Sequence, residues 1–262
     1  MEYKYETHLH TRQASACGLS NGRDYIDAYI NAGYAGLIVT DHFFNGNTAI
    51  DRTLPWEVRV NLFCRGYDEA YAMAKGRNFS VFFGWEYSYG EDEYLIYGLD
   101  KTWLLDHPEI MEWDHATLYH RVDRDGGLVV QAHPFRERSY LTTIHLHPYT
   151  VHAVEVINGE NVEEDDRKAR AYASYYDLPM TAGSDIHTSV KAGSKSRGVG
   201  FDEPLSSIAE YVQRIKARSG YHIVDDSSRA EAPHRNESNL PVYFYELDGS
   251  RRRIKASEAW GN

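Results

Sequence analysis

The chain has 262 residues, 42% of them hydrophobic, so it can bury one sizeable core and one main domain is expected. Its 39 acidic and 28 basic side chains give a formal charge of −11, which disfavours broad attraction to nucleic acid or to an anionic membrane. The first residues do not show a charged segment followed by an apolar one, and no apolar run reaches the roughly 18 residues needed to span a bilayer, so neither export nor a membrane span is expected. With only two cysteines, Cys17 and Cys64, it predicts a cytoplasmic protein without disulfides.

Short apolar runs alternate with segments of helical spacing along most of the chain. This alternation predicts a mainly parallel sheet. The gap between residues 86 and 93 is too short for a crossover helix and predicts a hairpin there. The strand candidates are 4–10, 36–42, 80–86, 93–100, 127–134, 153–159 and 178–187, and the helix candidates between them are 23–33, 56–76, 115–127 and 164–177.

The last part of the chain has a different composition. A helix candidate at 206–220 is followed by a polar stretch, 225–239, and then by a segment, 240–255, that predicts a β-hairpin with Asp248 and Gly249 in its turn. We therefore expect a barrel over residues 1–224. Residues 225–262 are expected to form a polar linker and a hairpin that packs on the barrel through its tyrosines and Phe244.

Histidines and carboxylates follow the apolar runs at the point where each predicted strand ends. In a closed α/β barrel the carboxyl ends of the strands converge on one face, where such enzymes keep their active sites. Residues i and i+2 of a strand point the same way, so a His-x-His pair offers two ligand atoms to one cavity. The sequence thus predicts a metal site built from His8, His10, His42, Glu86, His133, Asp185 and His187.

The ligand types narrow the chemistry of this predicted site. Imidazole and carboxylate groups without thiolate clusters suit zinc, manganese or iron, and more than four ligands imply more than one ion. Two neighbouring ions can hold a bridging hydroxide at neutral pH and neutralise charge during displacement at phosphorus. Hydrolysis of a phosphate ester, which is extremely slow in water, needs this concentration of positive charge.

Five short motifs in this order resemble those of the PHP (polymerase and histidinol phosphatase) domain family. The resemblance covers residues 3 to 200. It implies a distorted (β/α)7 barrel with up to three metal ions and phosphoesterase activity. The motifs are HLH at 8–10, TDH at 40–42, GWE at 84–86, QAHP at 131–134 and GSDIH at 183–187.

The resemblance also implies a distribution of ligands among three ions. His8, His10, Glu86 and Asp185 would hold the first ion, with Glu86 bridging to a second ion on His133, and His42 and His187 would hold the third. Glu93 stands where family members commonly have a histidine and offers a carboxylate instead. Where they commonly have Asp or His after the His-x-His pair, this chain has only Ser15 or Cys17. The third ion is therefore expected to be absent, weakly bound, or bound with Cys17 as a thiolate; the alternative for Cys17 is a small buried residue.

Residues near the ligands supply candidates for substrate binding. Arg136, three residues after His133, is expected to grip a phosphate at the mouth of the site or to be a solvated loop arginine. His147, in a second His-x-His with His145, is a candidate proton donor to the leaving oxygen, with a loop histidine as the alternative. Residues 190–200 predict a mobile cover or a flexible loop.

The resulting hypothesis is a metal-dependent phosphoesterase in which metal-bound hydroxide attacks a small phosphomonoester or nucleotide-type substrate. Two alternatives remain open: an amidohydrolase-type metal-dependent hydrolase, and a non-catalytic metal-binding regulatory module. PHP modules attached to DNA polymerases would connect the domain to nucleic-acid processing, but the charge of −11 favours a small phosphorylated substrate. No stable nucleic-acid complex and no membrane association are expected.

Overall fold

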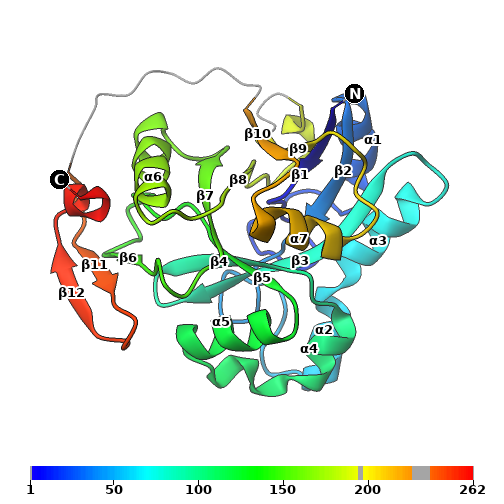
Figure 1. Ribbon diagram of the computed structural model, residues 1–262. Coiled ribbons are helices and arrows are strands. Elements are labelled where there is room, and N and C mark those ends of the chain that lie inside the picture. The colour runs from blue at the N-terminus through cyan, green and yellow to red at the C-terminus, as the bar shows by residue number, and fades with distance from the viewer. Residues whose placement is uncertain (1, 194–196, 226–236, 262) are drawn as a thin grey trace.

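A computed structural model of the chain describes residues 2–193, 197–225 and 237–261. Its centre is a nine-stranded sheet in the order β10-β9-β1-β2-β3-β4-β5-β7-β8, curved into a nearly closed barrel with helices outside (Figure 1). This confirms the predicted fold class. The strands are β1 (Tyr3–Glu6), β2 (Tyr34–Val39), β3 (Ser80–Tyr89), β4 (Asp92–Tyr97), β5 (Leu128–Gln131), β7 (Ala153–Asn158), β8 (Met180–Gly183), β9 (Arg197–Phe201) and β10 (Tyr221–Asp225).

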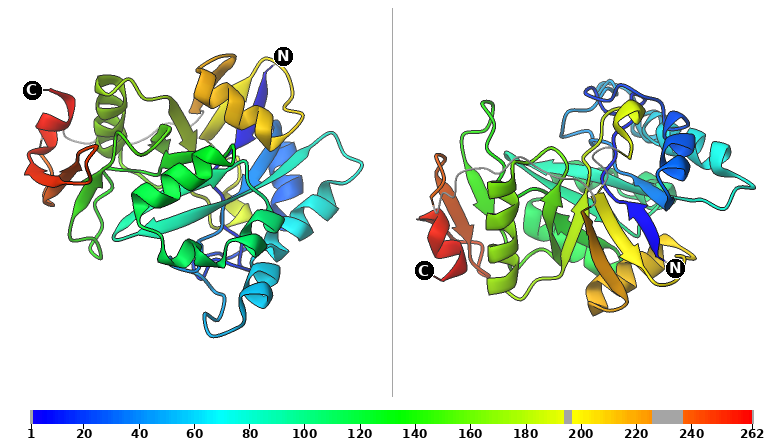
Figure 2. Two further views of the ribbon diagram at one scale, coloured as in Figure 1. Left: turned by 60° about the horizontal axis from the view of Figure 1, so that its bottom comes forward. Right: turned by 90° about the horizontal axis from the view of Figure 1, so that it is seen from above.

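Helices cover the outside of the barrel. Helix α1 packs on β2, α3 on β3, α5 on β5 and α6 on β7, as Figure 2 shows from two further sides. The predicted helix over 56–76 is two helices that meet at Cys64. The helices are α1 (Asp24–Asn31), α2 (Trp56–Phe63), α3 (Arg65–Ala74), α4 (Lys101–Asp106), α5 (His115–Arg124), α6 (Glu163–Tyr175) and α7 (Ile208–Ala217), with short 3-10 turns at Pro108–Glu112, Ser189–Lys191 and Ala256–Trp260. Every helix within the described ranges is too short or too polar to cross a bilayer.

The predicted strands are all present, and their burial explains why the sequence signals were clear. All six residues of β7 and all four of β5 are buried, as expected for strands covered on both faces. β3 and β4 are antiparallel, which confirms the hairpin between residues 86 and 93. β4 is also antiparallel to β5. The pairs β1–β2, β2–β3, β5–β7 and β7–β8 are parallel.

Two strands of the barrel were not predicted. β9 lies antiparallel to β1, and β10 lies antiparallel to β9. β9 falls within the segment 190–200, so the prediction of a mobile cover or flexible loop there is wrong for residues 197–200; residues 194–196 lie outside the described residues. The strand was missed because glycine interrupts its apolar pattern. Glycine is needed at position 198, where a Cβ would stand 1.9 Å from the carbonyl oxygen of Tyr5.

The barrel closes just beyond the ends of β1 and β8. The backbone N–H of His10 donates to the carbonyl of Ile186 at 2.9 Å, and the N–H of Ile186 donates to the carbonyl of His8 at 3.2 Å. Leu9 and Ile186 form a parallel bridge there. We call the segments 8–10 and 185–187 the closing seam.

A small second sheet lies at one side of the barrel, beyond α6 (Figure 1). β11 (Val242–Tyr245) and β12 (Arg251–Ile254) form the expected hairpin, and β11 also pairs in parallel with β6 (Ile144–Leu146), which lies in a segment predicted as loop. Phe244 shares an apolar cluster with Phe135 and Tyr172 of the barrel. The division at residue 225 stays a prediction, and most of the expected linker, residues 226–236, lies outside the described residues.

Candidate metal centre

The eight predicted ligand residues lie together at one end of the barrel. His8 and His10 follow β1, His42 follows β2, and Glu86 lies in β3. Glu93 is the second residue of β4, His133 follows β5, and Asp185 and His187 follow β8. Four groups of three offer ligand atoms within 4.8 Å of one another: His8, His10 and Asp185; His8, Glu86 and His133; His42, Glu86 and Glu93; and His10, His42 and His187. The carboxyl ends of the parallel strands share one face, and because β4 is antiparallel to β3, its amino end with Glu93 lies at that face too.

Glu86 is the centre of this arrangement. Its Oε1 lies 3.1 Å from Nε2 of His8 and 3.2 Å from Nε2 of His133. Its Oε2 lies 2.7 Å from Nδ1 of His42 and 3.5 Å from Nε2 of His10. One buried carboxylate thus faces four imidazoles, the position required of a ligand that bridges two ions.

Several of these atoms lack hydrogen bonds although water cannot reach them. Among the described residues, no group hydrogen-bonds to Nε2 of His8, Nε2 of His10, Nδ1 of His42 or Oε2 of Glu86. Buried polar atoms without partners are costly and rare in folded proteins. Imidazole nitrogens and carboxylate oxygens that point at one another in this way fit divalent cations lying between them.

The electrostatics of the cluster keep Glu86 and Asp185 ionised, whereas burial and the neighbouring Glu86 raise the pKa of Glu93. Burial acts to raise the pKa of Glu86, but His42 and His8 outweigh it and hold that pKa well below its usual range. Burial likewise acts to raise the pKa of Asp185, and His8 and Arg136 outweigh it in the same way. Burial and His42 lower the pKa of His10 to about 3, so its imidazole is neutral, the form that binds metal.

Two buried carboxylates that the sequence analysis missed orient the histidines. Oε1 of Glu155, in β7, accepts a hydrogen bond from Nδ1 of His8 at 2.9 Å and leaves Nε2 facing the cluster. Nδ1 of His10 lies 3.1 Å from Oγ of Ser15, which donates to Asp41 at 2.6 Å. Such outer partners fix the tautomer and direction of metal-binding histidines. One signal in the sequence could have identified Glu155: it is the one charged residue in the mostly apolar strand β7.

Glu6, at the end of β1, ties both sides of the closing seam together. Its Oε1 accepts backbone N–H groups from Thr7, His8 and Ser184, each at 2.9 Å. Its Oε2 accepts the hydroxyl of Tyr29 at 2.6 Å. Because His8 and Ser184 adjoin or belong to the ligand segments, this fully buried carboxylate fixes their relative position.

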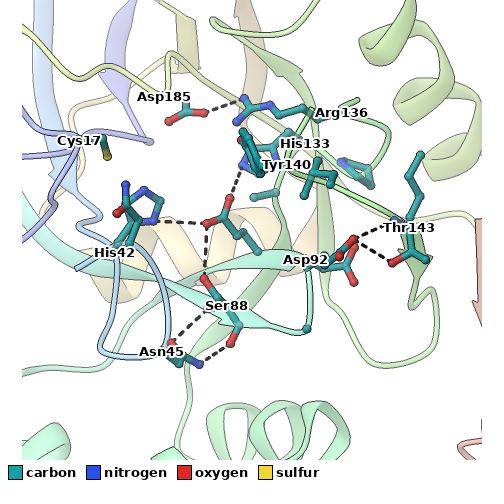
Figure 3. A pocket seen from close by; sticks show the side chains of 18 of the residues that line it. Cys17, His42, Asn45, Ser88, Asp92, His133, Arg136, Tyr140, Thr143 and Asp185 are labelled. Carbon is teal, nitrogen blue, oxygen red and sulfur yellow. Dashed lines mark hydrogen bonds and ion pairs between the residues drawn. The ribbon is translucent and has the colours of Figure 1, made fainter. Parts of the chain in front are cut away.

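A cavity of about 620 Å³ opens beside the cluster (Figure 3). His42, His133, Asp185 and His187 line one end of it, together with Cys17. Cys17 is therefore not a fully buried filler residue. Burial acts to raise the pKa of its thiol, but hydrogen bonds to His187 and His42 outweigh it and lower the pKa to about 7.

Arg136 lines the same cavity, but its guanidinium is largely occupied. Nη2 lies 2.7 Å from Oδ2 of Asp185 (Figure 3). Nη2 also donates to Asn158 at 2.6 Å, and Nε donates to Asn161 at 2.8 Å. The side chain is only 8% exposed, so it is not a solvated loop arginine. Its guanidinium pairs with Asp185, a predicted metal ligand. That Arg136 binds the phosphate of a substrate stays a prediction.

Replacing Arg136 with alanine is expected to weaken metal binding by about 10- to 100-fold and to lower activity, because Asp185 loses the partner that orients it. Competition with a chromogenic chelator would measure the affinity. Arg138→Ala, in the same loop but bonded to backbone carbonyls of Glu137 and Glu160, is the control. Unchanged metal affinity with a raised KM would instead make Arg136 a substrate-binding residue.

The structure does not bring His147 to the cluster. It is buried outside the cavity lining, where its ring stacks on Tyr245 at 4.1 Å and lies 4.3 Å from His115. Donation of a proton by His147 stays a prediction that this placement does not favour. His145 is likewise engaged elsewhere, with Nδ1 2.5 Å from Oδ2 of Asp92.

The buried position of His147 makes stability depend on pH. Burial and the neighbouring His115 lower its pKa to about 2, against 6.5 in the unfolded chain. Below pH 6.5 the unfolded state therefore binds a proton that the folded state does not, so stability falls as pH falls. We expect His147→Phe, which keeps the stack on Tyr245, to remove about 1.4 kcal/mol of this loss per pH unit.

Urea unfolding at pH 7.5 and at pH 5.0 would measure the effect. The exposed His120 on α5 provides the control variant, His120→Phe, which is expected to leave the difference between the two pH values as in the unmodified chain. Equal pH dependence in both variants would show that His147 does not carry the penalty.

Comparison with known proteins places the fold. No family model matches the sequence, and no curated protein matches it by sequence. Solved structures do match: a two-domain protein from Bacteroides vulgatus containing a predicted PHP-like metal-dependent phosphoesterase has a TM-score of 0.64 at 15% identity, covering 86% of this chain and 65% of that one. A proposed metal-dependent phosphoesterase from Bifidobacterium adolescentis has a TM-score of 0.52 at 15% identity, covering 82% and 96%.

A third match is the lesion-specific endonuclease Q from Pyrococcus furiosus, with a TM-score of 0.57 at 10% identity, covering 85% of this chain and 58% of that one. The chain thus has the fold of PHP-like metal-dependent phosphoesterases, as its motifs predict. It spans less than two thirds of the length of the Bacteroides protein and of the endonuclease. Identities of 10–15% establish the fold alone, so the chemistry rests on the residues described above.

Proposed function

We propose that the protein is a metal-dependent phosphoesterase that hydrolyses a small phosphomonoester or nucleotide-type substrate. The observation that carries this proposal is a set of buried imidazole nitrogens and carboxylate oxygens that face one another without hydrogen-bond geometry, beside an open cavity. Metal-dependent phosphoesterases among the solved structures of the same fold support it.

Two or three divalent ions of zinc, manganese or iron are proposed to occupy the cluster. When bound, they would activate water and neutralise charge on the phosphoryl oxygens. The first position would use His8, His10, Glu86 and Asp185; the second Glu86, His133 and Glu93; and the third His42 and His187, with Cys17 beside them as a further ligand. Glu155 and the pair of Ser15 and Asp41 hold the imidazoles in the orientation that these positions need.

A small substrate fits the cavity better than a nucleic acid. A volume of about 620 Å³ lies within the range of small-molecule sites. The net charge of −11 gives no general attraction for a polyanion. The endonuclease of the same fold acts on DNA lesions, but this chain is proposed to form no stable nucleic-acid complex.

Elemental analysis of the purified protein, paired with phosphate release from a panel of phosphomonoesters and nucleotides with added manganese or zinc, tests the proposal. Two or three ions per chain and turnover of a monoester are expected, and removal of the ions by a chelator should abolish turnover until metal is restored. One ion or none, with no phosphate released under any metal, would overturn the proposal in favour of a non-catalytic metal-binding module.

A further inference from the structure

The cavity beside the metal centre has an acidic end. Glu91, in the turn between β3 and β4, and Asp92, the first residue of β4, line this end, and Thr143 lies next to them. In Figure 3, Asp92 and Thr143 lie on the opposite side of the view from His42 and Asp185. The same cavity joins this end to the cluster, so an ester whose phosphate is held at the cluster can extend its alcohol toward it.

The charge of Glu91 is not offset by a neighbour. Its carboxylate accepts hydrogen bonds from the N–H and hydroxyl of Thr142, both at 2.6 Å, and from those of Thr143, at 2.8 and 3.0 Å. Four donors around two oxygens are the environment of an ionised carboxylate. Within the described ranges Glu91 forms no ion pair, whereas Asp92 pairs with His145. Glu91 is thus a fixed negative charge in the cavity lining.

Positive charge in the described lining comes from one residue besides the histidines. Glu91, Asp92, Glu93 and Asp185 supply four carboxylates, and Arg136 supplies a single guanidinium. Arg136 already pairs with Asp185 and hydrogen-bonds to Asn158 and Asn161. The remaining polar lining is neutral, as in Asn45, Asn47 and Ser88. Away from the proposed ions, the described lining of the cavity therefore has no free cation that could bind a second anionic group of a substrate.

From this distribution of charge we infer that the substrate is a phosphomonoester whose leaving alcohol carries no negative charge, and that Glu91 is a residue that determines this specificity. The inference rests on the proposed function and adds the chemical class of the leaving group. A carboxylate or second phosphate on the alcohol would be repelled by Glu91 over several ångströms, with solvent partly screening the repulsion. That repulsion corresponds to about a tenfold loss in kcat/KM.

Matched ester pairs of nearly equal size test the inference on the unmodified, metal-loaded protein. Glycerol 3-phosphate is compared with 3-phosphoglycerate, and phosphoethanolamine with phosphoglycolate. The ester with the uncharged or cationic alcohol is expected to have at least about tenfold higher kcat/KM in each pair. Equal rates, or faster hydrolysis of the carboxylate esters, would overturn the inference while leaving the phosphoesterase proposal intact. If p-nitrophenyl phosphate is not hydrolysed either, the proposed function itself fails.

A variant assigns the effect to Glu91. Glu91→Gln is expected to raise kcat/KM for 3-phosphoglycerate relative to glycerol 3-phosphate by about tenfold, with metal content unchanged. Glu57→Gln, on the exposed face of α2, makes the same change in charge outside the cavity and should leave the ratio as it was. An unchanged ratio in Glu91→Gln would remove Glu91 from the specificity. Because each ratio compares two substrates on one protein, partial loss of active protein does not alter it.

Discussion

Replacing Glu86 with glutamine is expected to remove bound metal and activity together, lowering kcat by at least about a thousandfold. The change keeps the shape of the side chain but removes the charge that faces His8, His133 and His42 at 3.1, 3.2 and 2.7 Å. An amide nitrogen directed at an ion or at a protonated imidazole cannot replace a carboxylate oxygen. Elemental analysis and a phosphate-release assay on the same preparation would measure both losses.

Glu57→Gln serves as the matched control, because Glu57 is exposed on α2. It should retain metal and activity within error. Circular dichroism and thermal unfolding would show that Glu86→Gln still folds. Full metal content in Glu86→Gln, with kcat within about tenfold of the unmodified protein, would contradict the bridging position assigned to this residue.

The second large effect is expected on stability. Glu6→Leu should lower the free energy of unfolding by about 3–5 kcal/mol, because it leaves three backbone N–H groups and the hydroxyl of Tyr29 without their acceptor in a fully buried place. Glu6→Gln should cost no more than about 1–2 kcal/mol. Its amide oxygen can still accept the three N–H groups, and its amide nitrogen can donate to Tyr29.

Urea unfolding of the two variants at neutral pH measures the difference between them. The glutamine variant controls for loss of charge, so the gap between leucine and glutamine reports the missing acceptor. Equal stability of the two variants would show that Glu6 does not hold the two ligand segments together. Metal affinity should follow stability, since both segments carry ligands.

The sequence predicted the barrel wherever burial on both faces gave an unbroken apolar run. β5 and β7 are such cases. It failed at β9, where Gly198 and Gly200 interrupt the apolar pattern because neighbouring groups approach too closely for a side chain. It also failed at β6, whose three residues give no periodicity and whose pairing partner lies about a hundred positions later. Strands that depend on distant partners carry little local signal.

The candidate ligands were predictable for a different reason. Seven of the eight stand at the ends of predicted strands, and barrel geometry brings those ends together. Glu93, at the start of the predicted strand 93–100, was expected only from the family resemblance. The supporting residues were not predictable in this way. Glu155, Asp41 and Glu6 act through contacts with residues far along the chain, and nothing in their local sequence specifies those contacts. His147 shares the His-x-His spacing of His8 and His10, yet it follows β6, a strand of the small second sheet, and packs among aromatic rings.

The closing seam also sets an order of assembly. Glu6 and Ser184, which join its two sides, are 178 residues apart in the chain. The proposed ligands that follow β1 are therefore synthesised long before those that follow β8, so the complete set is present only once the chain has reached β8. Contacts of such high sequence separation form late and slowly. An ion that binds only the complete set stabilises only the closed barrel. The candidate metal centre would in this way also hold β1 and β8, the first and last parallel strands, together.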